Sequence, residues 1–291
     1  MAMTHADFPT ELVRELFDGV KGHSALAKLT PSTPIPFSGI TEMVFTAADE
    51  ASLVLEGAAK PANDGTVDPV IIRPLKFVYQ MRLTDEFVKC SEEKRVSYLR
   101  GFNEGFAKKI ARGLDIAAMH GLDPRTLTPV ASLASNNFDG IVTNTVTYTA
   151  ATPDANIESA VAAVDGNYIN GIAMDPTFSA AMASLKVNGV PQFPELRFGA
   201  NPDAFAGLRS DVNDTVGKAQ SGASTTDKAI VGDFNAFRWG YADGVDFEVI
   251  EYGDPDGTGH DLKQYNQVLL RAEAYIGWGI LNADNFALIQ A

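Results

Sequence analysis

Hydrophobic and polar positions alternate with a period of two across much of residues 37–85. The pattern is clearest in residues 75–83, where apolar side chains fall at every second position and predict a strand with one apolar face: Leu75, Phe77, Tyr79, Met81 and Leu83. Shorter apolar runs continue it at residues 40–46, 52–55 and 70–72. Residues 56–65, between the incoming and outgoing runs, are rich in Gly, Pro, Asn and Asp, which favour turns. The segment is therefore predicted to form a long two-stranded hairpin.

This hairpin has no third strand beside it in the sequence. A two-stranded hairpin is marginally stable in water unless a further layer covers it. We therefore expect it to pack on a neighbouring subunit. The alternative, a hairpin folded back on its own domain, stays open at this stage.

Residues 86–120 carry the strongest helical pattern in the chain. One face, at steps of three and four residues, is formed by Leu99, Phe102, Phe106, Ile110, Gly113 and Ala117. Ser91 is the expected N-cap. Acidic side chains, Asp115 among them, are interleaved with Lys and Arg on the remaining surface, which favours a solvated or subunit-facing helix over a DNA-binding one. Gly101, Gly105 and Gly113 each cost about 1 kcal/mol relative to Ala in a helix interior, so the helix is either bendable or closely packed there.

The rest of the chain predicts an N-terminal arm and a mixed α/β region. Residues 11–17 form a short amphipathic helix in the arm, and the three prolines of residues 30–36 favour an extended path. Beyond residue 121, helices are expected at residues 154–164, with Asp154 as cap, and at 177–185, with Asp175 as cap. Strands are expected near 128–131, 141–149, 168–174, 229–234, 245–251 and 267–276, with a polar, flexible stretch at 213–228.

Composition narrows the class of protein. With 291 residues and 45% hydrophobic content the chain can bury a sizeable core, and it lacks the run of about 20 apolar residues that spans a membrane. The single cysteine, Cys90, excludes an intramolecular disulfide. A net charge of −14 repels DNA phosphates. That charge is consistent with simple solubility or with a protein that lies near DNA without binding it.

The search for catalytic chemistry gives no candidate. No His pair has metal-ligand spacing, and nucleophile-elbow, phosphate-loop and dinucleotide-binding motifs are absent from the sequence. His120, at the end of the long helix, is expected to have a structural role. The acidic loop 253–261 resembles a calcium loop, but Thr258 and Tyr265 stand where ligands are required, so a plain connecting loop is expected. We predict no catalytic, cofactor-binding or metal-binding residue and no cofactor.

Several short motifs, in a fixed order, resemble the major capsid proteins of tailed bacteriophages, which share the Hong Kong 97-type capsid fold. They are a Gly, Lys and Pro stretch at residues 56–61, a strand and helix cap at 172–176 followed by Leu185, Lys186 and Gly189, a Gly-Asp-Phe strand start at 231–234, and a closing pattern at 270–287. The resemblance implies an α+β fold and a structural protein of the virion, assembled in the host cytoplasm, rather than an enzyme.

The resemblance also implies a domain plan. It gives an N-terminal arm (1–36), an extended loop (37–85), a peripheral domain with a spine helix (86–150), an axial domain (151–245) and strands that return to the peripheral domain (246–291). The loop tip is expected to contact neighbouring subunits through Lys60, Pro61, Asn63, Asp64 and Gly65, without a covalent crosslink at Lys60. Gly101, Gly105 and Gly113 are the expected hinge of the spine helix.

The partners implied are other copies of the chain, arranged as pentamers and hexamers in an icosahedral shell. A separate scaffolding protein and a portal are expected, and the shell would enclose double-stranded DNA without sequence-specific binding and without a membrane. Two alternatives stay open. One is an encapsulin-like nanocompartment shell of the same fold, and the other is a soluble acidic α/β enzyme with a metal in loop 253–261.

Overall fold

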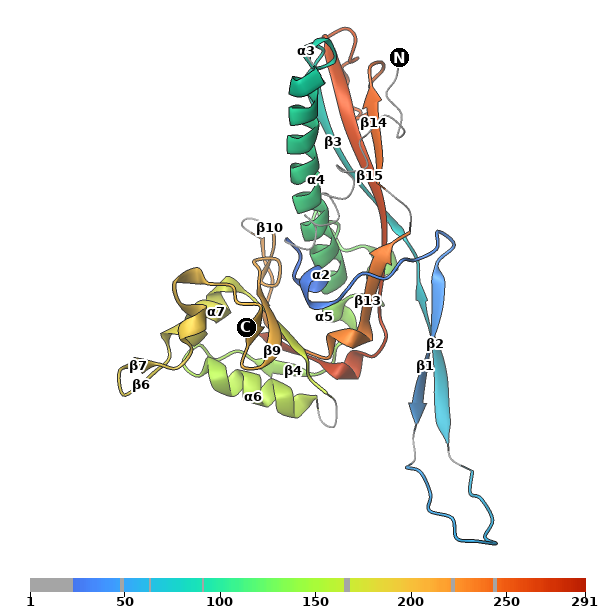
Figure 1. Ribbon diagram of the computed structural model, residues 1–291, viewed down its shortest axis with the longest axis vertical. Helices are drawn as coiled ribbons and strands as arrows, with labels where there is room; N and C mark the ends of the chain where they lie inside the picture. Colours follow the sequence, from blue (N-terminus) through green and yellow to red (C-terminus); the bar gives the residue numbers. More distant parts are fainter. Residues whose placement is uncertain are drawn as a thin grey trace.

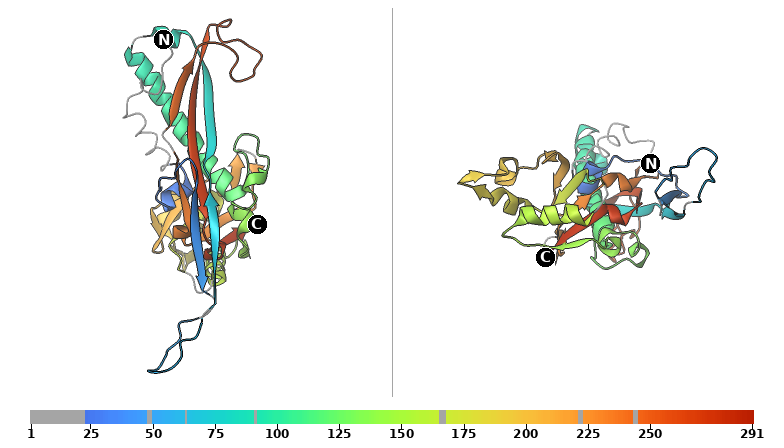
Figure 2. Two further views of the ribbon diagram at one scale, coloured as in Figure 1. Left: turned by 90° about the vertical axis from the view of Figure 1, so that its right-hand side faces the viewer. Right: turned by 90° about the horizontal axis from the view of Figure 1, so that it is seen from below.

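The computed structural model describes residues 23–47, 50–62, 64–90, 92–164, 168–220, 223–242 and 245–291. An elongated unit stands on a second, broader unit, and a hairpin projects beyond both (Figures 1 and 2). Helices and strands both contribute to each unit, which confirms the predicted α+β class. Among the described residues, no helix is long and apolar enough to cross a membrane.

The elongated unit is built on the long helix α4 (Glu92–His120), preceded by the short helix α3 (Glu86–Lys89). The predicted apolar face is the buried one, because Phe106 is fully buried and Leu99, Phe102, Ile110 and Ala117 are nearly so. The expected cap Ser91 lies outside the described residues. Asp115 was wrongly expected on the solvated surface of this helix, since its side chain is completely buried.

A four-stranded antiparallel sheet runs beside α4. Its long strand β15 (Gln267–Ile280) pairs on one side with β3 (Leu75–Thr84) and on the other with β14 (Asp246–Ile250) and β13 (Phe237–Tyr241). The rings of Tyr79 in β3 and of Phe102 and Phe106 in α4 pack together across the layer. The expectation that the whole outgoing run lacks a covering strand was therefore wrong, because β3 pairs with β15 in this sheet.

The projecting hairpin consists of β1 (Ile40–Ala47) and β2 (Gly65–Ile72), which pair antiparallel along their whole lengths. They form a sheet of two strands among the described residues. Residues 52–55, predicted to extend the incoming strand, have no strand structure.

The broader unit contains a six-stranded mixed sheet with the order β4-β16-β12-β5-β9-β8. The two longer helices of this unit are α6 and α7. Asp175 caps α7 as predicted, because its carboxylate accepts a hydrogen bond from the Thr177 amide at 2.8 Å. The residue before α6 is Thr152, so Asp154 lies in the first turn and not at the cap. The bounds are β4 (Thr145–Thr147), β5 (Gly171–Met174), β8 (Ala204–Phe205), β9 (Leu208–Val212), β12 (Asp227–Gly232), β16 (Phe286–Gln290), α6 (Pro153–Ala163) and α7 (Pro176–Ser184).

Three further expectations from the sequence were wrong. Residues 213–228, expected to be a polar loop, include a small hairpin and the fully buried Thr215 and Asp227. Residues 286–290, expected to return to the peripheral unit, pair with β12 and β4 in the six-stranded sheet. Residues 128–131 contribute an isolated bridge rather than a strand. The short elements are α5 (Phe138–Ile141), β6 (Lys186–Val187), β7 (Val190–Pro191), β10 (Lys218–Gln220) and β11 (Ala223–Ser224), with 3-10 turns at Ala131–Leu133, Pro194–Gly199, Phe234–Ala236 and Ala283–Asn285.

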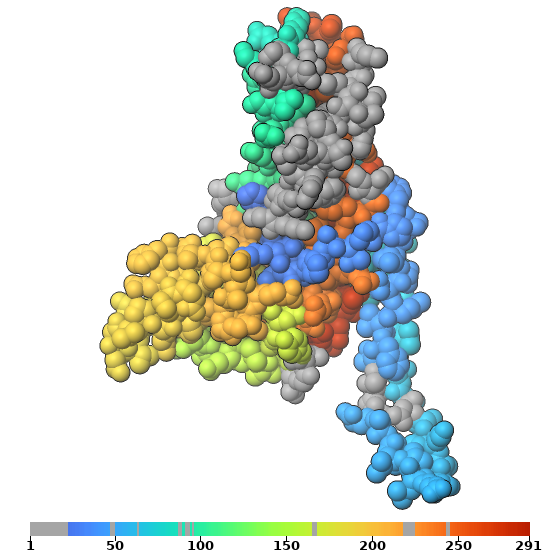
Figure 3. Space-filling view, viewed as in Figure 1, coloured from blue at the N-terminus to red at the C-terminus, as the bar shows by residue number. Residues whose placement is uncertain are grey.

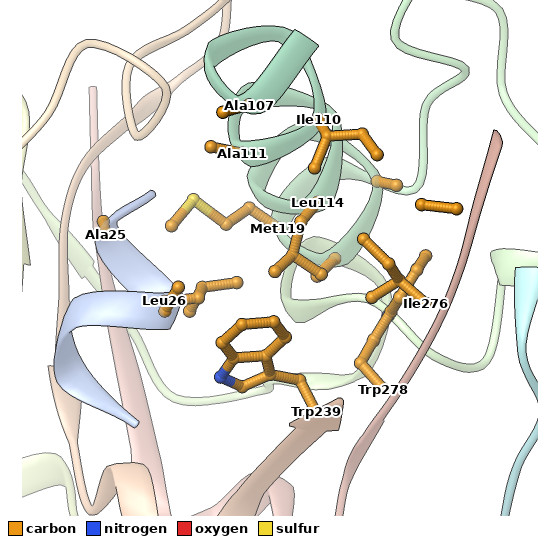
Figure 4. Packing of buried hydrophobic residues seen from close by; sticks show 14 of the residues in the cluster. Ala25, Leu26, Ala107, Ile110, Ala111, Leu114, Met119, Trp239, Ile276 and Trp278 are labelled. Carbon is orange, nitrogen blue, oxygen red and sulfur yellow. The ribbon is translucent and has the colours of Figure 1, made fainter. Parts of the chain in front are cut away.

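The core where the units meet gathers residues that are far apart in the sequence (Figure 4). Trp239 and Trp278 are almost completely buried in this core, to which α4 and the short helix α2 (Ala25–Leu29) also contribute. The Trp239 indole donates a hydrogen bond to the Thr30 carbonyl at 2.8 Å. The part of the expected arm that is described, residues 23–36, is thus anchored on its own subunit. The predicted helix at residues 11–17 lies outside the described residues.

Candidate assembly interface

One face of the β1–β2 hairpin carries an uncovered strip of apolar side chains. The register places Phe45 opposite Val67 and Met43 opposite Pro69, so these side chains lie on the same face. The exposed fractions are 66% for Met43, 68% for Phe45, 57% for Val67 and 54% for Ile71. An apolar strip of this kind on a two-stranded hairpin is typical of a surface that another protein covers.

The base of the same hairpin is attached to its own subunit through the opposite face. Ile72 is fully buried, and its side chain lies so close to Gly279 of β15 that a Cβ on that glycine would come within 2.7 Å of it. Arg238 of β13 forms an ion pair with Glu42 of β1. The hairpin is therefore fixed at its base, while its far end projects away from the body (Figure 3).

The predicted contact residues are at the far end of the hairpin, as the sequence indicates. Lys60 and Pro61 are exposed in the connection, and Asp64 precedes Gly65, which opens β2 opposite Ala47. Asn63 lies outside the described residues. The same connection holds two further exposed apolar side chains, Leu53 at 95% and Leu55 at 74%.

The three helix glycines fall into two structural classes. Gly101 and Gly105 line a groove of about 510 Å³ between α4 and β3, and a Cβ on either would meet no atom within 4 Å. A Cβ on Gly113 would lie 3.2 Å from the Phe77 ring, tighter than an ordinary carbon contact. Close packing within the subunit therefore accounts for Gly113 and not for Gly101 or Gly105.

The acidic loop 253–261 already holds a cation from its own chain. The Arg82 guanidinium donates hydrogen bonds to Asp254 at 2.8 Å and to Asp256 at 2.8 Å. Hydrogen bonding to Arg82 holds the pKa of the Asp256 carboxyl well below its usual range. The loop is thus folded around an arginine from β3. The aspartates that resemble a calcium loop bind this arginine instead.

Two buried polar groups connect the long helix to the rest of the molecule. The Asp115 carboxylate accepts hydrogen bonds from the Ser24 hydroxyl, the Ala25 and Leu26 amides and the Thr215 hydroxyl. Burial raises the pKa of Asp115 to about 6, although these four donors act in the opposite direction. Asp115 thereby positions the N-terminal turn of α2 and the loop before β10.

The second group is His120, the last residue of α4. Burial lowers the pKa of this imidazole, but its contacts with Asp139 and Asp227 outweigh that effect and raise the pKa to about 10. The structural role expected for His120 thus includes two acidic partners, of which Asp227 is distant in the sequence.

The comparisons with known proteins agree with this architecture. The model of the family described as "Phage capsid family" matches residues 8–291. The chain belongs to the phage capsid family. A search of curated proteins gave no match.

Several solved structures are similar to this chain over most of its length. A chain from Mycobacterium phage Ogopogo is 33% identical, with a TM-score of 0.78 and 92% of both chains covered. A chain from Gordonia phage Cozz is 25% identical, with a TM-score of 0.72, covering 91% of this chain and 85% of that one. A chain described as the capsid of an empty GTA particle is 14% identical, with a TM-score of 0.63 and coverage of 92% and 89%, and shows the fold alone.

Membership in the phage capsid family determines the class of function. The protein is a major capsid protein that forms a head shell, and its place is the virion. It is a structural protein and not an enzyme, which excludes the alternative of a metal-dependent α/β enzyme. Shell formation also implies assembly with further copies of the same chain.

The sequence pattern did not predict some contacts of the site. Alternation in residues 65–83 indicates strands but not that β2 and β3 have different partners, because the pairing of β3 with β15 joins positions nearly 200 residues apart. Arg82 stands at a regular polar position of the alternating strand, as Lys76 and Gln80 do, so the pattern did not mark it as the partner of the acidic loop. No signal marked the link between Asp115 and residues 24–26.

Proposed function

We propose that the β1–β2 hairpin clamps a neighbouring subunit in the assembled shell. The observation that supports this is the strip of Met43, Phe45, Val67 and Ile71, more than half exposed on a hairpin that is anchored at its base. The tip residues Lys60, Pro61, Asn63, Asp64 and Gly65 would lie at the far end of this contact.

The energetics fit an assembly role. Fully burying a large apolar side chain contributes about 1.5–3 kcal/mol. Each side chain of the strip is already partly covered, so its burial in an interface contributes about 1 kcal/mol. That contribution recurs at every hairpin of a closed shell, and heterologous contacts of this type allow many copies to join around one shell.

Paired substitutions test the clamp. Phe45→Ser with Val67→Ser removes apolar surface from the strip, whereas Thr46→Ala with Thr66→Ala changes a directly opposed pair on the other face. Negative-stain microscopy should show shells for the wild type and the threonine variant, and unassembled subunits for the Phe45/Val67 variant. Normal shells from the Phe45/Val67 variant would contradict the clamp.

A second element of the proposal concerns bending of α4. Gly101 and Gly105 are not required by packing within the subunit, and glycine in a helix interior permits bending. We therefore keep these two residues as the hinge and assign Gly113 to close packing. Replacing both with Ala should leave assembly intact and impair expansion of the shell, and normal expansion would remove the hinge from the proposal.

The finer partners remain proposals that rest on the resemblance and on charge. We expect pentamers and hexamers, a separate scaffolding protein, a portal, and enclosed double-stranded DNA that is not bound by sequence. A net charge of −14 suits a wall along which DNA must move. Co-expression with the genes beside it, followed by electron microscopy, tests these partners, and a cargo enzyme in place of DNA would favour the nanocompartment alternative.

The domain division is likewise proposed in a modified form. The arm, extended loop, peripheral and axial regions keep their predicted limits at residues 1–36, 37–85, 86–150 and 151–245. The closing region 246–291 is divided, with β14 and β15 in the peripheral sheet and β16 in the axial sheet.

A further inference from the structure

Three potential metal ligands meet where α4, α5 and β12 come together. They are the Nδ1 atom of His120 and one carboxylate oxygen each of Asp139 and Asp227, and the three atoms lie within 4.8 Å of one another. Nδ1 is 2.9 Å from Asp139 Oδ2 and 3.3 Å from Asp227 Oδ2. In the part of the chain that the structure describes, no other group of at least three such residues has this geometry.

A hydrogen bond from Nε2 fixes the orientation of the His120 imidazole. Nε2 lies 2.9 Å from the carbonyl oxygen of Thr215, which can only accept, so Nε2 carries a proton. Nδ1 then faces two carboxylates, which also accept. Three acceptors cannot meet without a proton or a metal ion between them, and the proton lies either on Nδ1 or on one of the two carboxyl groups.

Asp227 gives an independent reason to consider a metal ion. Its side chain is fully buried, its Oδ1 accepts a hydrogen bond from the Gln290 amide at 2.8 Å, and its Oδ2 accepts none. A buried carboxylate oxygen without a hydrogen-bond donor is costly. This oxygen is directed at the point where Nδ1 and Asp139 Oδ2 also converge.

Charge distinguishes the two cations. With a protonated imidazole and two ionised carboxylates, the cluster, in which His120 and Asp227 are buried, carries a net charge of −1. A divalent ion between a neutral imidazole and the same carboxylates brings the net charge to zero. Buried charge is tolerated mainly when it is paired, which favours the divalent ion.

The distances also suit a small divalent ion. Zinc binds imidazole nitrogen and carboxylate oxygen at about 2.0–2.2 Å, so ligands of a tetrahedral site lie about 3.3 Å apart. Nδ1 lies 2.9 Å and 3.3 Å from the two carboxylate oxygens, which is close to this separation. Hydrogen bonds from His120 to the Thr215 carbonyl and from Gln290 to Asp227 are the outer contacts that orient ligands in metal sites. The Asp139 side chain is 32% exposed, which leaves access for the ion and for a water ligand.

We propose that His120, Asp139 and Asp227 bind one Zn²⁺-like divalent ion that ties the end of the long helix to the six-stranded sheet. The ligands come from the last residue of α4, from α5 and from the first residue of β12. Bound metal would therefore stabilise the junction between the peripheral and axial units in every subunit of the shell.

Metal analysis of the purified full-length protein tests the site. After chelator treatment, addition of ZnSO₄ and desalting, elemental analysis should find about one zinc per wild-type chain, and the melting temperature should rise by several degrees. Asp139→Asn should lose most of the zinc and the thermal shift. Because Asp139 is partly exposed, this variant should still fold, as its circular dichroism would show.

A control separates this cluster from the other acidic group of the molecule. Asp256→Asn changes the loop that holds Arg82 and should retain the zinc. Cobalt in place of zinc should give the visible absorption of a tetrahedral Co²⁺ ion with the wild type and not with Asp139→Asn. Zinc at well below one per wild-type chain, or equal zinc in Asp139→Asn, would overturn the proposal and leave a proton as the cation.

Discussion

The consecutive strands β2 and β3 have similar hydrophobic patterns, but their apolar faces pack differently. β3 alternates apolar and polar side chains, β2 does so until the apolar run at residues 70–72, and only Arg73 and Pro74 separate the two strands. The apolar face of β3 packs on α4, where Tyr79 contacts Phe102 and Phe106. The apolar face of β2 continues across β1 and remains open. Alternation therefore predicts that a strand needs a partner, but not whether the partner belongs to the same chain.

This difference separates two kinds of stability. Contacts of β3, α4 and β15 hold one subunit together before assembly. Contacts of the β1–β2 strip contribute only when a second subunit covers it. Substitutions in the two regions should thus affect different measurements.

The largest effect on the isolated subunit is expected from Phe106→Ala. Phe106 is fully buried among aromatic rings, and removing a buried phenylalanine costs about 3–5 kcal/mol. The matched variant Phe45→Ala removes the same atoms from an exposed site and should change the free energy of unfolding by less than about 0.5 kcal/mol. Denaturant unfolding of unassembled subunits measures both, and equal losses would erase the distinction between the two strands.

A smaller effect is expected from Asp115→Asn. Each carboxylate oxygen accepts from one hydroxyl and one backbone amide, so either orientation of an asparagine side chain sets its NH₂ group against a backbone N–H. Such a mismatch costs about 1–3 kcal/mol. Glu104→Gln, at an exposed position of the same helix, is the control, and denaturant unfolding should show a loss for Asp115→Asn alone.

The smallest effects concern the glycines of α4. Gly105→Ala should raise the stability of the isolated subunit by about 1 kcal/mol, because alanine favours helix and its methyl group has room. Gly113→Ala should be at least about 1 kcal/mol less stable than Gly105→Ala, because its methyl group crowds Phe77. Thermal unfolding of the two variants compares them, and equal melting temperatures would refute the division into two classes.

The sequence predicted the parts of the fold that depend on neighbouring residues. The periodicity of residues 99–117 identified the buried face of α4, and Asp175 was recognised as a cap because the cap and the helix start are adjacent. The same local reasoning predicted the paired strands β1 and β2, but it wrongly added residues 52–55 and 75–83 to the hairpin.

The parts that escaped prediction depend on contacts between distant residues. Asp115 has the sequence context of a surface residue and is buried only because residues 24–26 and Thr215 supply donors. His120 meets Asp227 across more than a hundred residues, and Arg82 meets loop 253–261 in the same way. Periodicity carries no information about such pairs.

A high-resolution electron cryo-microscopy structure of the assembled shell tests the central claim most directly. The quantity to measure is the exposed fraction of Met43, Phe45, Val67 and Ile71 in the context of neighbouring subunits. We predict that all four, now between 54% and 68% exposed, become buried against another copy of the chain. A shell in which this strip still faces solvent would contradict the assignment of the hairpin as the clamp between subunits.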